Sequence, residues 1–263
     1  MTSLDCFREL HARDQLFLLP NPWDIGSAKI LAALGFEALA TTSAGFALAI
    51  GKTDQTVMRD ELVAHVAELA AATTLPLNVD SERLYPDDPG GVAETVGMLA
   101  DAGAAGCSIE DYDPETGRID DPGAAAERVG VAAEAARGRL VLTARAENHL
   151  YAAGDLDDTI ARLVAYRDAG ADVVYAPGLT SLIYIRRVVE SVGVPVNVLA
   201  LRAGPSVGEL AEAGVRRVST GSGLARAAYG AFVAAAEELR DSGTSEYAAR
   251  NLTSDRSDPM LNP

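Results

Sequence analysis

The chain of 263 residues is long enough for one large α/β domain, and its content of 48% hydrophobic and 23% charged residues is that of a globular protein. The 38 acidic residues outnumber the 22 basic ones and give a net charge of −16, which disfavours binding to nucleic acid or to an anionic membrane. Two cysteines, Cys6 and Cys107, cannot build a disulfide framework or a cysteine zinc site. No apolar run reaches the roughly 20 residues of a membrane helix. The N-terminus lacks a signal-peptide pattern, so we expect a cytoplasmic protein.

One structural unit recurs along the chain. Four helical segments each end in a glycine and lead within two or three residues into a short apolar run; they cover residues 31–35, 99–103, 166–170 and 210–214. Glycine at this position is typical of a helix that ends in the left-handed conformation. Other apolar runs follow a proline or glycine. The full pattern predicts eight strands, over residues 15–20, 37–42, 75–80, 106–110, 140–145, 172–176, 195–199 and 216–220.

The strands are continuously apolar and an Ala-rich helical stretch follows each of them, as expected when both faces of a parallel sheet are covered. Eight βα units in about 250 residues predict a (β/α)8 TIM barrel, with an open doubly wound sheet as the alternative. We expect a single barrel domain over residues 1–246. The polar residues 247–263 are expected to form a C-terminal tail or an arm onto a neighbouring subunit.

Acidic residues follow two neighbouring strands of the predicted barrel, at the end where barrel enzymes carry their active sites. Asp80 and Glu82 follow the third strand, and Glu110 ends the fourth. Several carboxylates at one barrel mouth repel one another unless a cation or protons intervene. Mg²⁺ is suited to such a set of oxygen ligands. The alternative interpretation is that these acids are solvated loop residues in a chain that has many of them.

Arg145 ends the fifth predicted strand, after the buried run 140–144. Its planar guanidinium could bind a substrate carboxylate or phosphonate. The alternative is an internal ion pair with Glu147 or Glu110.

Residues 42–45, after the second strand, are small and polar, so their backbone N–H groups could hold an oxyanion, or they could form a plain turn. Trp23 could form a wall of a small-molecule pocket or belong to the core. No phosphate-binding glycine motif occurs, so a nucleotide cofactor has no support.

Seven segments together resemble the isocitrate lyase/phosphoenolpyruvate mutase superfamily, in particular its smaller phosphonomutase-like branch. In chain order they are 21–24 (NPWD), 42–46 (TSAGF), 51–54 (GKTD), 80–82 (DSE), 109–111 (IED), 144–145 (AR) and 209–219 (ELAEAGVRRVS). The resemblance extends over residues 21–243. It implies a (β/α)8 barrel of the phosphoenolpyruvate/pyruvate-domain type whose eighth helix is often exchanged between subunits. A homodimer or homotetramer is therefore expected.

The resemblance also implies the site. Asp80 would hold Mg²⁺, or Mn²⁺, directly, while Asp54, Glu82 and Glu110 would hold it through water. A small 2-oxo or 2-hydroxy carboxylate would be bound by Arg145 and by main-chain groups of Ser43, Ala44 and Gly45, and Trp23 would line the pocket. Arg145, Glu110 and Glu147 are the residues expected to serve catalysis, through a pyruvate-like enolate.

The loop after the fourth strand departs from the family pattern. Lyases of the family carry a Cys in this loop as general acid, and the phosphonate enzymes carry Lys and Asn, whereas residues 111–120 here (DYDPETGRID) contain none of these. The glycines usual after the Asp-x-Glu pair are Leu84 and Pro86. The proton donor is therefore unassigned, with Tyr112, Glu147 and His149 as candidates.

Three functions fit these observations. The first is a Mg²⁺-dependent lyase that cleaves the bond next to the carbonyl or hydroxyl of a small 2-oxo or 2-hydroxy acid, like methylisocitrate lyase or oxaloacetate decarboxylase. The second is C–P chemistry, as in phosphonopyruvate hydrolase or phosphoenolpyruvate phosphonomutase, which the Arg145-Ala-Glu147 pattern favours. The third is a barrel that binds 2-oxo acids without turning them over, which the altered loop favours.

Overall fold

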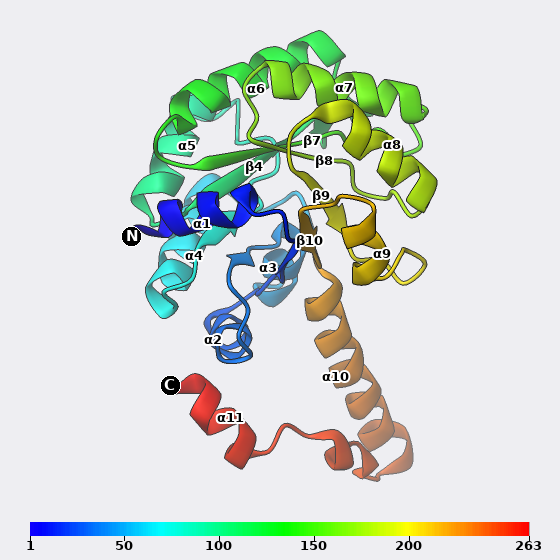
Figure 1. Cartoon of the computed structure of the whole chain (residues 1–263). Helices are drawn as coiled ribbons and strands as arrows, with labels where there is room; N and C mark the ends of the chain where they lie inside the picture. Colours follow the sequence, from blue (N-terminus) through cyan, green and yellow to red (C-terminus); the bar gives the residue numbers. More distant parts are fainter. Residues whose placement is uncertain (263) are drawn as a thin grey trace.

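Eight parallel strands form a nearly closed barrel in the computed structural model, which describes residues 1–262 (Figure 1). In chain order the strands are β1 (Phe17–Leu19), β2 (Leu39–Ala40), β3 (Leu77–Val79), β4 (Gly106–Glu110), β7 (Val141–Arg145), β8 (Val173–Tyr175), β9 (Val196–Leu199) and β10 (Arg217–Ser219). Their order around the sheet is β1-β10-β9-β8-β7-β4-β3-β2. All eight predicted strands are present. The (β/α)8 barrel is confirmed and the open doubly wound sheet was the wrong alternative.

Helices surround the barrel. They are α1 (Ser3–Ala12), α2 (Ile25–Ala33), α3 (Ser43–Ala49), α4 (Arg59–Ala72), α5 (Gly91–Asp101), α6 (Pro122–Ala136), α7 (Leu156–Asp168), α8 (Leu182–Val192), α9 (Val207–Glu212), α10 (Gly223–Ser242), the 3-10 helix η1 (Glu246–Arg250) and α11 (Ser254–Leu261). The glycines predicted to end four helices, Gly35, Gly103, Gly170 and Gly214, all have positive φ, between 85° and 111°. This conformation is strained for other residues, which explains why the repeated pattern uses glycine.

The core has two parts. The larger part lies between the strands and the surrounding helices. The smaller part contains Phe7 and Leu10 of α1, which pack on Phe17, Val141 and Val173 at the amino ends of three strands. Helix α1 therefore closes the base of the barrel and leaves the carboxyl ends of the strands open for a site.

Asn21 joins the strands at the open seam of the barrel, where β1 and β2 share no ladder. Its side-chain Nδ2 donates to the carbonyl of Thr41 (2.6 Å), and its Oδ1 accepts from the backbone N–H groups of Thr220 and Gly221 (2.9 Å each). The side chain is buried, at 5% exposure. One amide thus connects the ends of β1, β2 and β10.

We expect Asn21→Ala to lower the free energy of unfolding by about 3 kcal/mol, because it leaves buried N–H groups without partners. Urea denaturation measures the change. Asn251→Ala is the matched control, since Asn251 is exposed and only its backbone forms a hydrogen bond; it should change stability by less than about 0.5 kcal/mol. Equal stability of the two variants would contradict the assigned role of Asn21.

Helix α10 projects away from the barrel, and the chain then turns back through η1 to α11, which packs against α2 (Figure 1). Lys29 of α2 donates to the carbonyl of Leu261 in α11 (3.0 Å). Most of α10 is exposed, including the apolar Phe232 (68%) and Val233 (50%). The predicted exchange of the eighth helix and the predicted contact of the tail with a neighbouring subunit stay predictions. None of the helices within residues 1–262 is long and apolar enough to cross a membrane.

A small antiparallel hairpin follows β4, where the sequence predicted only a loop. It consists of β5 (Tyr112–Asp113) and β6 (Arg118–Ile119). Arg83 holds it from the β3 side through ion pairs with Asp113 (2.9 Å) and Asp120 (3.1 Å). Tyr112 stacks on Tyr151 of the loop after β7, with ring centroids 4.0 Å apart. The hairpin is therefore held against the barrel mouth from two sides.

Candidate active site

A cavity of about 160 Å³ opens at the carboxyl ends of the strands and is lined by residues of several strands and their following loops. Asp54, Asp80 and Arg145 line its upper part, together with Ser43 and Ala44 at the start of α3. This volume is that of about five water molecules at liquid density. The cavity therefore suits a small polar molecule.

Arg145 is the centre of the charge arrangement. Its Nη1 lies 2.5 Å from Asp80 Oδ1 and 3.1 Å from Glu110 Oε2, and its Nε donates to Glu147 Oε1 (2.8 Å). Its guanidinium also lies over the ring of Tyr175, 5.4 Å from the centroid. Arg145 thus forms the internal ion pairs with Glu147 and Glu110 that the alternative interpretation predicted. Its Nη2, however, makes no hydrogen bond in the described chain, so this nitrogen remains available to a ligand.

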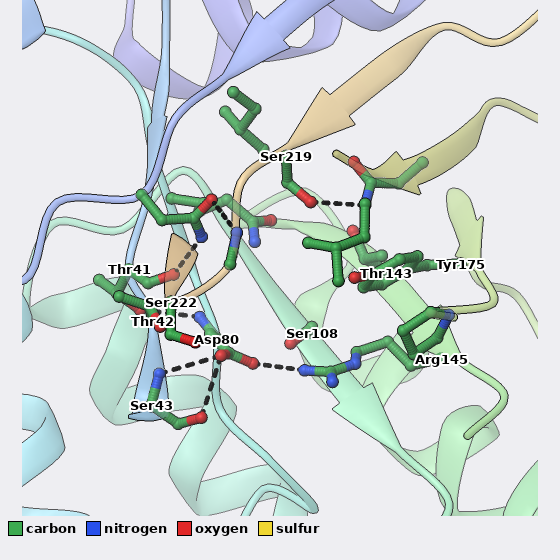
Figure 2. A pocket seen from close by; sticks show the side chains of 18 of the residues that line it. Thr41, Thr42, Ser43, Asp80, Ser108, Thr143, Arg145, Tyr175, Ser219 and Ser222 are labelled. Carbon is green, nitrogen blue, oxygen red and sulfur yellow. Dashed lines mark hydrogen bonds and ion pairs between the residues drawn. The ribbon is translucent and has the colours of Figure 1, made fainter. Parts of the chain in front are cut away.

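Asp80 is held from two sides, as Figure 2 shows. Its Oδ1 accepts from Arg145, and its Oδ2 accepts from the N–H (3.0 Å) and the hydroxyl (3.1 Å) of Ser43. The Asp80 N–H donates to Thr41 Oγ1 (2.8 Å). The carboxylate is therefore fixed at the mouth of the barrel, between the end of β3 and the start of α3.

The other predicted metal ligands surround this pair but do not meet at one point. Glu110 is buried and accepts from Gln55 Nε2 (2.9 Å), and burial raises its pKa. Burial, with the negative charges of Asp80 and Asp54, raises the pKa of Glu82 to about 8, and its Oε1 has no hydrogen-bond partner within the described residues. Burial and the Asp80 charge also raise the pKa of Asp54.

The backbone around these acids is strained. Gln55, Glu82, Leu84 and Tyr85 all have positive φ, between 48° and 63°, although none is glycine. Such conformations cost free energy and gather where function requires a particular geometry. The two segments that carry Asp54 and Glu82 thus place strained backbone at the mouth of the barrel.

The carboxylates around Arg145 are suitable oxygen donors for a hydrated divalent cation. Five carboxylates surround the single guanidinium of Arg145, and Glu82 has a buried oxygen without a partner; the five are Asp54, Asp80, Glu82, Glu110 and Glu147. Oxygen-only donors of this charge suit Mg²⁺, which keeps several waters. Across residues 1–262 no three acids converge closely enough to form a complete metal cage. These acids thus offer oxygen donors at the mouth without forming a closed cage.

A buried network supports Arg145 from behind. The N–H of Glu147 donates to Asp111 Oδ1 (2.8 Å). Asp111 Oδ2 accepts from Arg162 (3.1 Å) and from the Tyr166 hydroxyl (2.5 Å). Asp111 is 1% exposed. This network fixes the segment that carries Arg145 and Glu147 relative to α7.

Some of the predicted substrate-contact residues line the cavity and others do not. Ser43 and Ala44 line the cavity, whereas Gly45 and Trp23 do not. Residues 42–45 begin helix α3 rather than form a loop, and the Gly45 N–H is used to cap it, donating to Thr42 Oγ1 (3.2 Å). The Trp23 N–H donates to Ser27 Oγ (3.0 Å). Substrate-contact roles for Gly45 and Trp23 stay predictions without support from the cavity lining.

Sequence reasoning missed the polar residues that line the lower part of the cavity. Asn78, Ser108 and Thr143 each precede a predicted site residue by two positions, and so point to the same face of their strands as Asp80, Glu110 and Arg145. Tyr175 and Arg217 complete this lining. The signal was in the sequence: isolated polar residues at every second position of otherwise apolar strands.

Comparison with known proteins finds relatives over most of the chain. The sequence profile of the phosphoenolpyruvate phosphomutase family matches residues 7–240. The oxaloacetate decarboxylase of Chromohalobacter salexigens is 28% identical over 258 residues, which are 94% of this chain and 88% of that enzyme.

Two solved structures are similar over almost the whole chain. A Burkholderia cenocepacia J2315 protein, provisionally assigned as a lyase/mutase, has a TM-score of 0.94 and 48% identity, covering 99% of this chain and 96% of that one. The 2,3-dimethylmalate lyase, a member of the PEP mutase/isocitrate lyase superfamily, has a TM-score of 0.87 and 26% identity, covering 99% and 95%.

Proposed function

Because the chain belongs to the phosphoenolpyruvate phosphomutase family, within the PEP mutase/isocitrate lyase superfamily, we propose that it is a Mg²⁺-dependent lyase for a small 2-oxo or 2-hydroxy carboxylate. In an oxaloacetate-like 2-oxo acid the bond between C3 and the far carboxylate breaks, CO2 leaves, and the electron pair remains as a pyruvate enolate that takes up a proton. In a methylisocitrate-like 2-hydroxy acid the bond next to the hydroxyl carbon breaks, the hydroxyl gives up its proton to become the 2-oxo group of pyruvate, and the other fragment leaves as a carboxylate enolate that takes up a proton. The observation that carries the proposal is the free Nη2 edge of Arg145, beside Asp80, in a small cavity with polar lining.

Arg145 binds the substrate carboxylate in this mechanism. Its Nε and Nη1 are held by Glu147 and Asp80, so the guanidinium plane is fixed before a ligand arrives and little side-chain entropy is lost on binding. The ring of Tyr175 supports the plane from one side. The unused Nη2 then donates to a carboxylate oxygen.

The acids would hold the cation, with Asp80 closest and Asp54, Glu82 and Glu110 acting through water. When bound, Mg²⁺ supplies positive charge where negative charge grows on the substrate oxygen. The main-chain N–H of Ala44, which has no hydrogen-bond partner in the described residues and borders the cavity, is placed to donate to an oxyanion as well.

The hairpin β5–β6 brings no Cys, Lys or His to the mouth. A reaction that needs little acid catalysis, such as decarboxylation of an oxaloacetate-like acid, fits this loop best. Of the candidate proton donors, Glu147 is bound to Arg145. Tyr112 stacks on Tyr151 through its ring, and this contact leaves its hydroxyl without a hydrogen-bond partner in the described residues.

The test is a panel of 2-oxo and 2-hydroxy acids with Mg²⁺, followed by detection of pyruvate. We expect pyruvate from at least one member. Phosphate release from phosphonopyruvate would instead favour C–P chemistry. Tight Mg²⁺-linked binding without any product would favour a binding protein. Asp80→Asn, which preserves shape and removes charge, should reduce turnover at least 100-fold if Asp80 acts as proposed.

We also propose that the chain forms a homodimer or homotetramer through α10. Leu224, Phe232, Val233 and Leu239 expose apolar surface on a helix that has Ala225 as its buried residue. An apolar surface of this kind is more typical of a subunit interface than of a free helix.

Phe232→Glu is expected to shift the chain towards the monomer, because a carboxylate would have to be buried in the interface. Light scattering after size-exclusion chromatography measures the mass. Glu237→Gln, a neutral change on the same helix, is the control. A wild-type chain that is monomeric at micromolar concentration would contradict the proposed assembly.

A further inference from the structure

A second arginine lies deep in the cavity and the proposed chemistry does not use it. Arg217, on β10, is 2% exposed and lines the same cavity as Arg145. Its partners are all neutral: Nε donates to Asn197 Oδ1 (2.9 Å), Nη2 donates to Thr143 Oγ1 (2.9 Å), and Nη1 contacts His11 Nε2 (3.2 Å). Within residues 1–262 no carboxylate pairs with it.

This environment differs from that of the other buried arginines. Arg145 contacts three carboxylates, and Arg162 pairs with Asp111 and Asp158. Burial lowers the pKa of Arg217 to about 9, which still leaves it charged at neutral pH. Burial and the charge of Arg217 lower the pKa of His11 to about 3, so the imidazole is neutral and offers no compensation. A buried charge without a counter-charge is costly, and folded proteins normally pair it.

The guanidinium also has donors to spare. It carries five N–H groups, and three contacts to side chains are present. Asn78 lines the same cavity at 5% exposure, makes no side-chain hydrogen bond in the part of the chain described, and buries its Oδ1 without a partner. The lower end of the cavity thus combines an uncompensated cation with an amide that can pair with a ligand or water.

We propose that the floor of the cavity, formed by Arg217, Asn197, Thr143 and Asn78, is an anion subsite that binds the far carboxylate of a short dicarboxylate substrate. The near carboxylate of that substrate binds at Arg145. The subsite rests on the proposed function and makes it more specific, because it selects dicarboxylates over monocarboxylates. Arg217 is here a specificity-determining residue that binds the substrate and donates no proton in the reaction.

The test compares three probes by calorimetry in the presence of Mg²⁺: oxalate, malate and 2-hydroxybutyrate. Oxalate, whose two carboxylates are directly bonded, is the probe for the Arg145 end of the cavity, and 2-hydroxybutyrate has a methyl group in place of the far carboxylate of malate. The wild type should bind malate more tightly than 2-hydroxybutyrate. Arg217→Gln should weaken malate binding about 10- to 100-fold, the effect of losing a charged hydrogen bond, and should change oxalate and 2-hydroxybutyrate binding less than twofold.

Asn78→Ala is the second variant, and it should fold because Asn78 forms no internal side-chain hydrogen bond. We expect it to weaken malate binding several-fold and to leave oxalate binding unchanged. Arg217→Lys, which keeps the charge, should retain part of the preference for malate.

Two results would overturn the subsite. A wild type that binds malate and 2-hydroxybutyrate equally while binding oxalate shows that the floor holds no carboxylate. An Arg217→Gln variant that melts at a lower temperature and weakens all three probes equally shows that Arg217 only ties the strands to α1. Failure of oxalate to bind the wild type is a different outcome: it contradicts the proposed function itself, and the substrate role of the subsite falls with it.

Discussion

Replacing Arg145 with methionine is expected to abolish oxalate binding, with a loss of at least about 100-fold in affinity. Methionine keeps an unbranched side chain but removes the single cation among Asp80, Glu110 and Glu147. The ligand then loses a charged hydrogen bond and meets uncompensated carboxylates, and each effect alone costs on the order of 2 kcal/mol. Calorimetric titration with oxalate and Mg²⁺ measures the change.

Two further variants make this result specific. Arg145→Lys keeps the charge but loses the planar fork that contacts three carboxylates at once, so binding should recover only in part. Arg139→Gln is the matched control, since Arg139 is on the surface and pairs with the exposed Asp101. Unchanged oxalate affinity in Arg145→Met, with the fold intact, would remove Arg145 from the site.

Replacing Asp111 with asparagine is expected to lower the free energy of unfolding by about 3 kcal/mol or more. The variant keeps the shape of the side chain but leaves Arg162 with only the partly exposed Asp158 as a counter-charge. Removing one member of a buried pair usually costs about 3–5 kcal/mol, because the other charge is left uncompensated. The melting temperature should fall by roughly 10 °C.

Asp101→Asn provides the comparison, because it removes a carboxylate whose ion pair with Arg139 is exposed to solvent. It should alter stability by less than about 1 kcal/mol. Tyr166→Phe removes one hydrogen bond to Asp111 and should have an intermediate effect. If Asp111→Asn and Asp101→Asn have the same melting temperature, the network around Asp111 does not stabilise the mouth of the barrel.

The architecture could be predicted from the sequence because it depends on local and repeated signals. Glycines such as Gly103 and Gly170 mark where a helix ends in the left-handed conformation, and an apolar run of strand length follows each of them. The same logic predicted Asp80 and Arg145 at the mouth, since strand ends are where such barrels carry side chains into solvent.

Long-range partners could not be predicted in this way. The spacing of Arg145 and Glu147 suggested a pair, but nothing local indicated that Asp80, 65 positions away, would contact the same guanidinium. The hairpin after β4 was missed because Arg83 and Tyr151, distant in sequence, hold it. Residues 42–45 were predicted as an oxyanion-binding segment or a plain turn, and the helix start was missed because it depends on Thr42 acting as the cap.

The floor of the cavity shows a third kind of limit. Asn78 and Thr143 were visible as polar residues inside apolar strands, and a period of two connects them to Asp80 and Arg145. Their proposed role in binding an anion depends on Arg217, which has neutral side chains as its hydrogen-bond partners. No sequence motif indicates this environment, because it arises only when the barrel folds.

The most direct test of the site is a titration of the wild-type chain with oxalate, first with Mg²⁺ and then after treatment with a chelator. We expect oxalate to bind in the presence of Mg²⁺ and to bind at least tenfold more weakly after chelation. In Arg145→Met we expect no oxalate binding under either condition. Oxalate binding that is indifferent to the chelator, or that persists in Arg145→Met, would contradict a metal-assisted carboxylate site at the mouth of this barrel.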